Sequence, residues 1–315
     1  TQTNNVRLKM VCYYALGKSY DKLDDTEQAF NYYVLANKLQ KKLTDFNTAQ
    51  LNPFYKRILE KNTPALIKSA DRAFKSAITP VFIIGMPRSG STLLEQMLAN
   101  HSQFTTLGEN SSISNQVVAF IEQQTHSPYP KCMSLLTSDL IAKARNIYVE
   151  TLKTAQPIRP YIINKLPSNY QSIGLIYLLF PNAKFVNLSR GFNATAFSVF
   201  SNYFAQNEPY FCDLTEFKHY HTLYTELMVH WQSMPDIAIY NMSYEQLVTE
   251  PKAQLNALFS FLNCQFEPQC LQFYTRKSAV TTLSKQAIRQ PVNTSAVAHW
   301  QRYKTPLLKL LDETP

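Results

Sequence analysis

Residues 80–92 read PVFIIGMPRSGST, and this stretch decides the fold. Pro80 opens a run of four apolar residues, 81–84, which is typical of a buried strand in a parallel sheet. Gly85 ends the run, and helical patterning follows over residues 91–100. A loop between a buried strand and the first turn of a helix presents backbone amides that bind anions. The stretch therefore predicts an anion-binding loop in an α/β protein.

The loop has the GxxxxG spacing of nucleotide P-loops, but it lacks their lysine. Ser91 stands at the lysine position, and Thr92 keeps the hydroxyl that normally follows it. Arg88, inside the loop, supplies a different cation, suited to a single phosphate or to a sulfonate. A strand–turn–helix with incidental glycines is the alternative interpretation of this spacing.

The rest of the chain alternates strands with helices. Further strands are expected at residues 161–164, 184–188 and 237–241, and helices at 193–204 and 245–262. Alternation of this kind indicates an α/β fold with a doubly wound, P-loop-like parallel sheet flanked by helices. Residues 207–220 are polar, aromatic and poorly periodic, and are a candidate lid or acceptor-side segment.

Residues 1–45 have the pattern of two helices, broken near Asp24 and Asp25. The small and aromatic residues fit the tetratricopeptide (TPR) template, at Gly17, Tyr20, Ala29, Tyr33 and Ala36. One repeat cannot bury its own face, so we expect the end of a longer array that binds a protein or forms a homo-oligomer. An ordinary amphipathic helical hairpin is the alternative. Residues 46–79 are predicted to be linking helices, and residues 80–315 the α/β domain.

The amino-acid composition limits the classes of ligand and partner that the protein is expected to bind. The 315 residues include 31 Lys and Arg against 22 Asp and Glu, a net charge of +9, which suits anionic ligands. No basic run with interleaved aromatics predicts nucleic-acid binding, and no apolar run reaches the ~18 residues of a membrane helix. The cysteines are odd in number and scattered, which predicts reduced thiols, a cytoplasmic protein and no metal site; they are Cys12, Cys132, Cys212, Cys264 and Cys270.

Three further signals are weaker when each is taken alone. Arg190 ends a predicted strand, and Ser198 follows eight residues later, so the two could hold one phosphate. Lys165 follows another strand at the edge where α/β sheets bind ligands. Glu109 comes after the helix that the loop begins. Each also fits a structural or surface role.

Taken together, the motifs resemble the sulfotransferase superfamily. They are PVFIIGMPRSGSTLLEQMLANH, KLPSNY, LLFPNAKFV, YEQLV and the Arg190/Ser198 pair. Within the superfamily the chain is similar to the bacterial tetratricopeptide-repeat sulfotransferases and the tyrosylprotein sulfotransferases. The resemblance covers roughly residues 6–43 and 80–305.

The resemblance implies the donor 3′-phosphoadenosine 5′-phosphosulfate (PAPS), the product 3′,5′-ADP, no metal, and transfer to a hydroxyl acceptor such as a peptide tyrosine or another phenol. It implies that Glu109 is the catalytic base and that Lys165 and Arg88 stabilise the transferred group. The residues that it implies for donor binding are Arg88, Ser89, Gly90, Ser91 and Thr92 at the phosphosulfate, Arg190 and Ser198 at the 3′-phosphate, Tyr244 at the nucleotide, and Ser284, Arg289 and the turn 291–293 in a C-terminal clamp.

Three positions depart from the superfamily pattern. Gly191 follows Arg190 where Asp or His is usual, Asn202 stands where the tyrosylprotein branch has arginine, and His299 stands where Lys or Arg is common. All three bear on donor affinity. Two other functions stay open: a kinase-like P-loop phosphotransferase, and a catalytically inactive binding protein that contains the repeat.

Overall fold

The computed structural model describes residues 2–44, 46–74, 76–204, 209–275 and 289–312. The chain divides into two compact units. The sheet unit contains residues 53–189 and 226–293, and the hairpin unit contains residues 1–52, 190–225 and 294–315. The boundaries predicted at residues 45 and 80 stay predictions.

The sheet unit is built on five parallel strands in the order β2-β3-β1-β4-β5. Their bounds are β1 Thr79–Gly85, β2 Phe104–Thr106, β3 Tyr161–Asn164, β4 Lys184–Ser189 and β5 Ile239–Ser243. Residues 81–84 of β1 are fully buried because strands pair on both sides and helices cover both faces. The predicted parallel sheet flanked by helices is confirmed.

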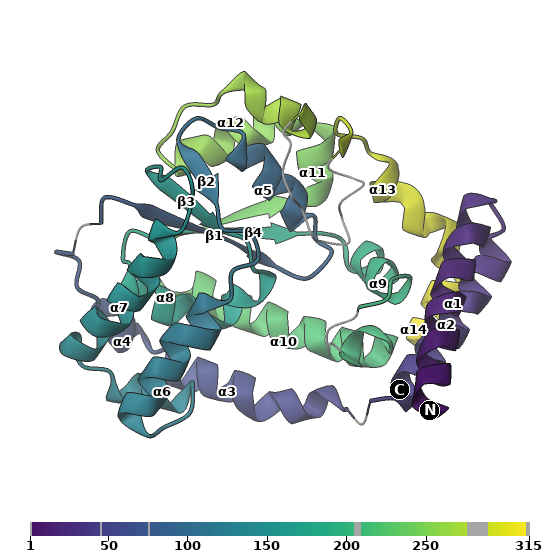
Figure 1. Ribbon diagram of the computed structural model, residues 1–315, viewed down its shortest axis with the longest axis horizontal. Coiled ribbons are helices and arrows are strands. Elements are labelled where there is room, and N and C mark those ends of the chain that lie inside the picture. Colours follow the sequence, from purple (N-terminus) through teal and green to yellow (C-terminus); the bar gives the residue numbers. More distant parts are fainter. Residues whose placement is uncertain (1, 45, 75, 205–208, 276–288, 313–315) are drawn as a thin grey trace. The chain divides into compact units, whose positions relative to one another are not determined.

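Helices flank this sheet on both faces (Figure 1). On one face lie α5 Ser91–Ala99, α11 Tyr244–Thr249 and α12 Pro251–Phe261; on the other lie α7 Ser138–Lys153 and α8 Ile173–Leu179. The remaining α-helices of the unit are α3 Asn52–Lys61, α4 Pro64–Lys68 and α6 Ala119–Thr125, which a π-helical turn, Ile113–Val118, precedes. Short 3-10 helices are Lys131–Leu135, Pro167–Ser172 and Pro268–Thr275.

The hairpin unit contains the two amino-terminal helices and later segments of the chain. Its helices are α1 Gln2–Lys22, α2 Thr26–Lys42, α9 Phe192–Phe200, α13 Ser295–Ala298 and α14 Lys304–Asp312, with 3-10 turns at Thr48–Leu51, Pro209–Phe211 and His299–Tyr303. The long helix α10, Leu214–Gln232, crosses the unit boundary at residue 225.

The turn between α1 and α2 lies where the sequence predicts it. Asp24 has a positive φ of 66°, and the Asp25 side chain caps α2 by accepting from the Gln28 amide at 3.0 Å. A Cβ at Gly17 would lie 2.5 Å from Cε1 of Tyr33, so the glycine lets the two helices approach. The helical pair is confirmed, whereas its assignment as a tetratricopeptide repeat and its binding of a partner stay predictions.

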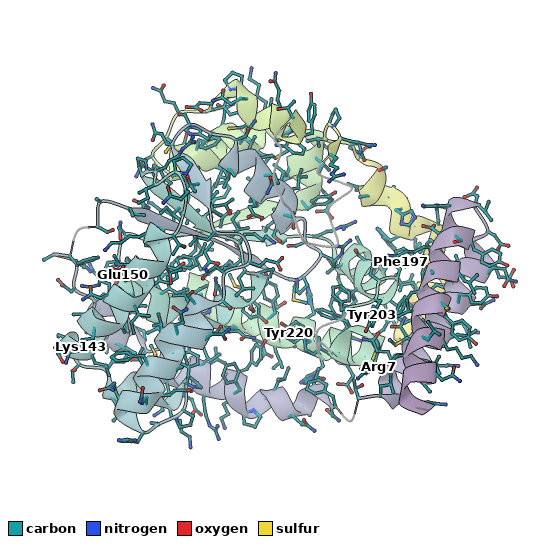
Figure 2. The ribbon with its side chains drawn as sticks, in the orientation of Figure 1. Arg7, Lys143, Glu150, Phe197, Tyr203 and Tyr220 are labelled. Atoms are coloured by element: carbon teal, nitrogen blue, oxygen red, sulfur yellow. The ribbon has the colours of Figure 1, made fainter. Side chains whose placement is uncertain are left out.

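Within the hairpin unit, α2 packs against α9. The ring of Phe197, labelled in Figure 2, meets Tyr33 edge-on with centroids 6.2 Å apart. The Asn37 side-chain amide donates to the Phe200 carbonyl at 2.8 Å and thereby satisfies a carbonyl at the end of α9. A predicted helix pair thus finds its neighbour in a distant part of the same chain.

Two predicted elements differ from the structure in their bounds: the strand expected at 237–241 is Ile239–Ser243, and the helix expected at 193–204 is Phe192–Phe200. Two others differ in kind. The single helix expected over 245–262 is two helices, because Pro251 cannot donate its amide within a helix and begins α12 instead. The segment 207–220, expected to be irregular, contains the start of α10 at Leu214. Leu214, Phe217 and Tyr220 are buried at a spacing of three residues, which is a helical period, and residues 207 and 208 lie outside the described residues.

Candidate active site

Two glycines shape the loop between β1 and α5. Gly85 has φ 145°, and a Cβ there would collide with the Leu188 carbonyl oxygen of β4. Gly90 has φ 98°, and its Cβ would lie 2.8 Å from Cε2 of Tyr244. Arg88 between them is also left-handed, with φ 67°. Alternating backbone conformations of this kind turn successive amides toward one side and make a concave anion site.

The serine inside this loop fits an anionic ligand. Ser89 is fully buried, and its hydroxyl oxygen has no hydrogen-bond partner among the described residues. A buried hydroxyl without a partner is rare, because it loses its hydrogen bonds to water. A phosphate or sulfonate oxygen would accept this proton, so the loop residues fit a donor with such groups. The Tyr244 ring, packed on Gly90, forms a wall of the loop.

Strand pairing brings Glu109 and Lys165 together. The register β2–β3 places Thr106 beside Ile163. Beyond this pair, the Lys165 amide donates to the Gly108 carbonyl at 2.9 Å, so the segments that follow β2 and β3 stay side by side. The Lys165 ammonium then donates to Oε1 of Glu109 in an ion pair. Parallel pairing therefore explains why these two residues meet at the carboxyl edge of the sheet.

The two members of this pair differ in exposure. The Lys165 side chain is 1% exposed, and the Glu109 side chain is 49% exposed. Lys165 also has a second carboxylate nearby, since its Nζ lies 3.7 Å from Oε2 of Glu95. Sequence reasoning missed Glu95. The sequence did carry a signal, because Glu95 is the one charged residue in the segment 91–99. The structure shows that this whole segment, α5, is buried.

The end of β3 is pinned from its other side by Asn164, which is 1% exposed. Its side-chain amide donates to the Asn110 carbonyl at 3.0 Å and to the Tyr148 hydroxyl at 2.9 Å. Burial raises the pKa of Tyr148, so this phenol stays protonated. The bond to Asn110 holds the chain directly after Glu109, and thus limits where the carboxylate can lie.

Arg190 and Ser198 belong to the hairpin unit, where Nη2 of Arg190 donates to the Ala296 carbonyl at 2.6 Å. Arg289 is exposed, and Ser284 lies outside the described residues. The roles of all the predicted site residues stay predictions.

Two of the departing positions make local contacts. The side-chain amide of Asn202 donates to the Ser198 carbonyl at 2.9 Å. Nε2 of His299 lies 3.0 Å from Oδ1 of Asp21 in the hairpin unit. Both side chains thus have partners within their own unit that bear on local folding.

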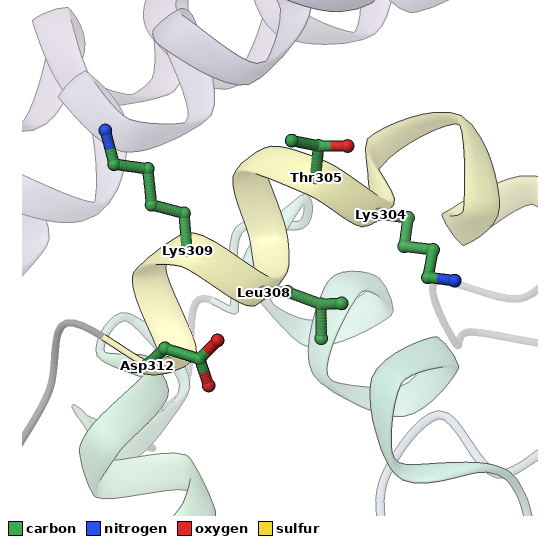
Figure 3. A pocket seen from close by; sticks show the side chains of 5 residues that line it. All are labelled: Lys304, Thr305, Leu308, Lys309 and Asp312. Atoms are coloured by element: carbon green, nitrogen blue, oxygen red, sulfur yellow. The ribbon is translucent and has the colours of Figure 1, made fainter.

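A hollow runs along α14 (Figure 3). Its lining side chains all come from this one helix, at Lys304, Thr305, Leu308, Lys309 and Asp312. A surface formed by one helix has no opposing wall to enclose a ligand. We therefore place the candidate site at the loop and the Lys165 pair.

The part of the chain that the structure describes has neither a metal-binding cluster nor a membrane-spanning helix. No group of three or more His, Cys, Asp or Glu side chains there is placed to hold a metal ion, and no helix there is long and apolar enough to cross a bilayer. The five cysteines are all free thiols.

Comparison with known proteins decides the family. A sequence model of the sulfotransferase family matches residues 80–268, more than half of the chain. The chain belongs to the sulfotransferase family. The predicted resemblance is confirmed, and the matched residues include the loop, Glu109 and Lys165 of this sulfotransferase.

Relatives of this sulfotransferase extend the match. An Aquifex aeolicus (strain VF5) protein described as uncharacterized is 29% identical over 95% of the chain, and the alignment covers 41% of that protein. Protein-tyrosine sulfotransferase A of Caenorhabditis elegans is 25% identical over 70% of the chain and 60% of the relative. The chain thus spans less than two thirds of the length of these two relatives.

A solved structure was also found. The sulfotransferase domain from the olefin synthase of Synechococcus PCC 7002 is 18% identical, with a TM-score of 0.49 over 78% of this chain and 98% of that domain.

Proposed function

We propose that this sulfotransferase moves a sulfuryl group from PAPS to a hydroxyl acceptor. The observation that carries the proposal is the ion pair between Lys165 and Glu109 at the carboxyl end of β3. The anion loop follows β1, the neighbouring strand of the same sheet. A buried cation beside a half-exposed carboxylate combines charge stabilisation with an accessible proton acceptor.

The donor supplies a sulfonate that is transferred as its bond to the bridging phosphate oxygen breaks and a bond to the acceptor oxygen forms. Arg88, the hydroxyls of residues 89, 91 and 92, and the loop amides hold the phosphosulfate end. Lys165 and Arg88 balance negative charge as it develops. Glu109 takes the proton that the acceptor hydroxyl loses. Catalysis then rests on positioning and electrostatics.

The proposed acceptor is a phenol, and a peptide tyrosine in particular. Relatives named protein-tyrosine sulfotransferases support this choice. The exposure of Glu109 also supports it, because 49% of the side chain is open to a partner that approaches from solvent. A phenol loses its proton more readily than an aliphatic alcohol, so one carboxylate suffices as base.

The kinase-like alternative and the inactive binding protein are not favoured. A kinase-like enzyme would need a cation at the lysine position of the P-loop, where this chain has Ser91. The family match also points away from phosphoryl transfer.

Calorimetry with 3′,5′-ADP in EDTA tests the donor site. Binding should persist without divalent metal, and Arg88→Ala should weaken it by roughly 10-fold or more, since a charged hydrogen bond contributes about 1.5–3 kcal/mol. Arg57→Ala, an exposed arginine on α3, is the matched control and should bind normally. Equal affinity for ATP with Mg²⁺, or a strict metal requirement, contradicts the proposal.

The role of Arg190 is tested by comparing the affinities of Arg190→Ala for 3′,5′-ADP and 5′-AMP. If it holds the 3′-phosphate, Arg190→Ala weakens 3′,5′-ADP far more than 5′-AMP, which lacks that group. Equal loss for both ligands would assign Arg190 to structure, in line with its bond to the Ala296 carbonyl.

Labelled PAPS with a panel of tyrosine peptides, simple phenols and saccharides tests the acceptor. We expect transfer to the tyrosine peptides and phenols. Transfer to saccharides alone would still support a PAPS-dependent sulfotransferase, but it would refute the proposal that the acceptor is a phenol.

A further inference from the structure

The contacts around Lys165 give Glu95 a role that the catalytic assignment leaves out. Glu95 is 4% exposed, on a helix whose nine residues are all buried. A carboxylate in such surroundings is strongly destabilising unless cations or hydrogen bonds compensate for the lost water. Two observed partners do so: the Lys165 ammonium and the Thr106 hydroxyl.

The two carboxylates near Lys165 are not equivalent. The Glu109 side chain is 49% exposed, whereas that of Glu95 is 5% exposed and shares the buried environment of the lysine. When the acceptor hydroxyl engages Glu109, Lys165 loses part of its compensation. An ammonium left alone in a buried site would be destabilised by several kcal/mol. Glu95 is the partner that stays in place.

A second series of contacts connects Glu95 to the backbone next to Glu109, the proposed base. The Thr106 hydroxyl donates to Oε1 of Glu95 at 2.6 Å. The hydroxyl oxygen of Thr106 in turn accepts a hydrogen bond from the Gly108 amide at 2.9 Å. Because the single hydroxyl proton goes to Glu95, the lone pairs of Thr106 face the amide. Gly108 has φ 66° and directly precedes Glu109, so these bonds hold the corner that presents the base.

We propose that Glu95 is a positioning residue for the proposed transfer: it is the permanent counter-ion of Lys165 and, through Thr106, the anchor of the Gly108–Glu109 corner. The proposal rests on the proposed function for its catalytic consequence, while the contacts stand without it. It explains how Glu109 can leave its ion pair to accept a proton while Lys165 keeps a partner and stays in place. Glu95 itself touches neither reactant.

The main test is Glu95→Gln, which removes the charge and keeps the shape. Leu98→Val, a fully buried residue of the same helix, is the matched control because it loosens α5 without changing its charges. We expect Glu95→Gln to lower kcat roughly 10- to 100-fold, as misplacement of a catalytic group by about 1 Å does. KM and 3′,5′-ADP affinity should stay within about threefold of the wild type, since the loop contacts remain.

A second readout does not depend on turnover. Acylation of Lys165 by an amine reagent, followed by mass spectrometry, reports whether the buried amine is still held. We expect faster acylation in Glu95→Gln than in wild type and in Leu98→Val. Equal acylation and equal kcat in Glu95→Gln and Leu98→Val would overturn the proposal.

A pair of Thr106 variants covers the case in which Glu95→Gln fails to fold. Thr106→Val removes the hydroxyl between Glu95 and Gly108, and Thr106→Ser restores it. Low kcat in the valine variant with recovery in the serine variant supports the anchor. Unchanged kcat in Thr106→Val refutes it. If wild type transfers no sulfuryl group at all, the proposed function fails, while the acylation result still decides the role of Glu95.

Discussion

Two clusters of charged side chains, one in each unit, share a central ion among several partners. In the sheet unit the centre is Lys165, with Glu109 and Glu95 around it. In the hairpin unit the centre is Asp21, which accepts from His299 at 3.0 Å and Tyr303 at 2.5 Å and lies 3.3 Å from Arg302.

The clusters differ in where their exposure lies. In the first, the centre is 1% exposed and one partner, Glu109, is open to solvent. In the second, the centre is 20% exposed, and its partners all come from the segment between α13 and α14. An open carboxylate beside a buried cation suits proton transfer, whereas an anion bound by three donors suits the attachment of one segment to another. The comparison predicts that one cluster acts in turnover and the other in stability.

The largest expected effect is that of Glu109→Gln. Loss of a positioned base lowers turnover by about 10²–10⁴-fold, while 3′,5′-ADP affinity and stability change little, because the side chain is half exposed. Single-turnover rates and calorimetry measure both. Glu150→Gln on α7, whose exposed side chain Figure 2 labels, is the control and should transfer at the wild-type rate. Unchanged turnover in Glu109→Gln would leave the two clusters without a functional difference.

Asp21→Asn should affect stability instead. The amide keeps the shape but loses the charge that Arg302 faces, and we expect unfolding to become easier by about 1–3 kcal/mol. Urea unfolding measures the change. His299→Gln removes one partner of three and should cost less than Asp21→Asn. A larger loss in His299→Gln would mean that the histidine, and not the aspartate, centres this cluster.

The stabilisation by Asp21 should also depend on pH. Burial alone would raise the pKa of Asp21, but hydrogen bonds from His299 and Tyr303 and the charges of His299 and Arg302 lower it overall. Since the folded pKa is lowered, the stabilisation is fully present above the unfolded value of about 3.9 and is lost as the pH falls through the folded value. The difference in stability between wild type and Asp21→Asn should therefore be constant above about pH 5 and should shrink as the pH falls below about 4. A difference in urea unfolding that stays constant from pH 6 to pH 3 would contradict the assigned charge partners.

The smallest effect is expected for an ion pair that belongs to neither cluster. Nζ of Lys143, a residue that Figure 2 labels, lies 2.8 Å from Oδ2 of Asp139 on the same helix, α7, and the two side chains are 62% and 75% exposed. Exposed pairs of this kind contribute about 0–0.5 kcal/mol. Lys143→Gln should leave turnover and urea midpoint unchanged. A loss comparable to that of Asp21→Asn would show that partner number and burial do not separate the clusters.

Local patterns were enough for several elements. The apolar run 81–84 followed by Gly85 predicts β1 and the loop, because a buried parallel strand and a tight turn both leave short, unambiguous signals. The break at Asp24 and Asp25 likewise predicts the end of α1 and the start of α2. The resemblance to sulfotransferases then named Glu109 and Lys165, whose roles spacing alone does not supply.

Other elements have no such signal. β2 is three residues long, too short for a period, and it forms a strand because β3 pairs with it. The break before α12 was missed because the apolar period runs on through Pro251.

By itself the sequence determined the α/β class, the loop after β1 without the P-loop lysine, the helical pair and the family to which the chain belongs. Only the tertiary structure decided which charges meet: Glu95 with Lys165, and Asp21 with His299, Arg302 and Tyr303. The physical reason is that strand and helix patterns are set by neighbours within a few residues, whereas the pairing of buried charges depends on packing between segments far apart in the chain.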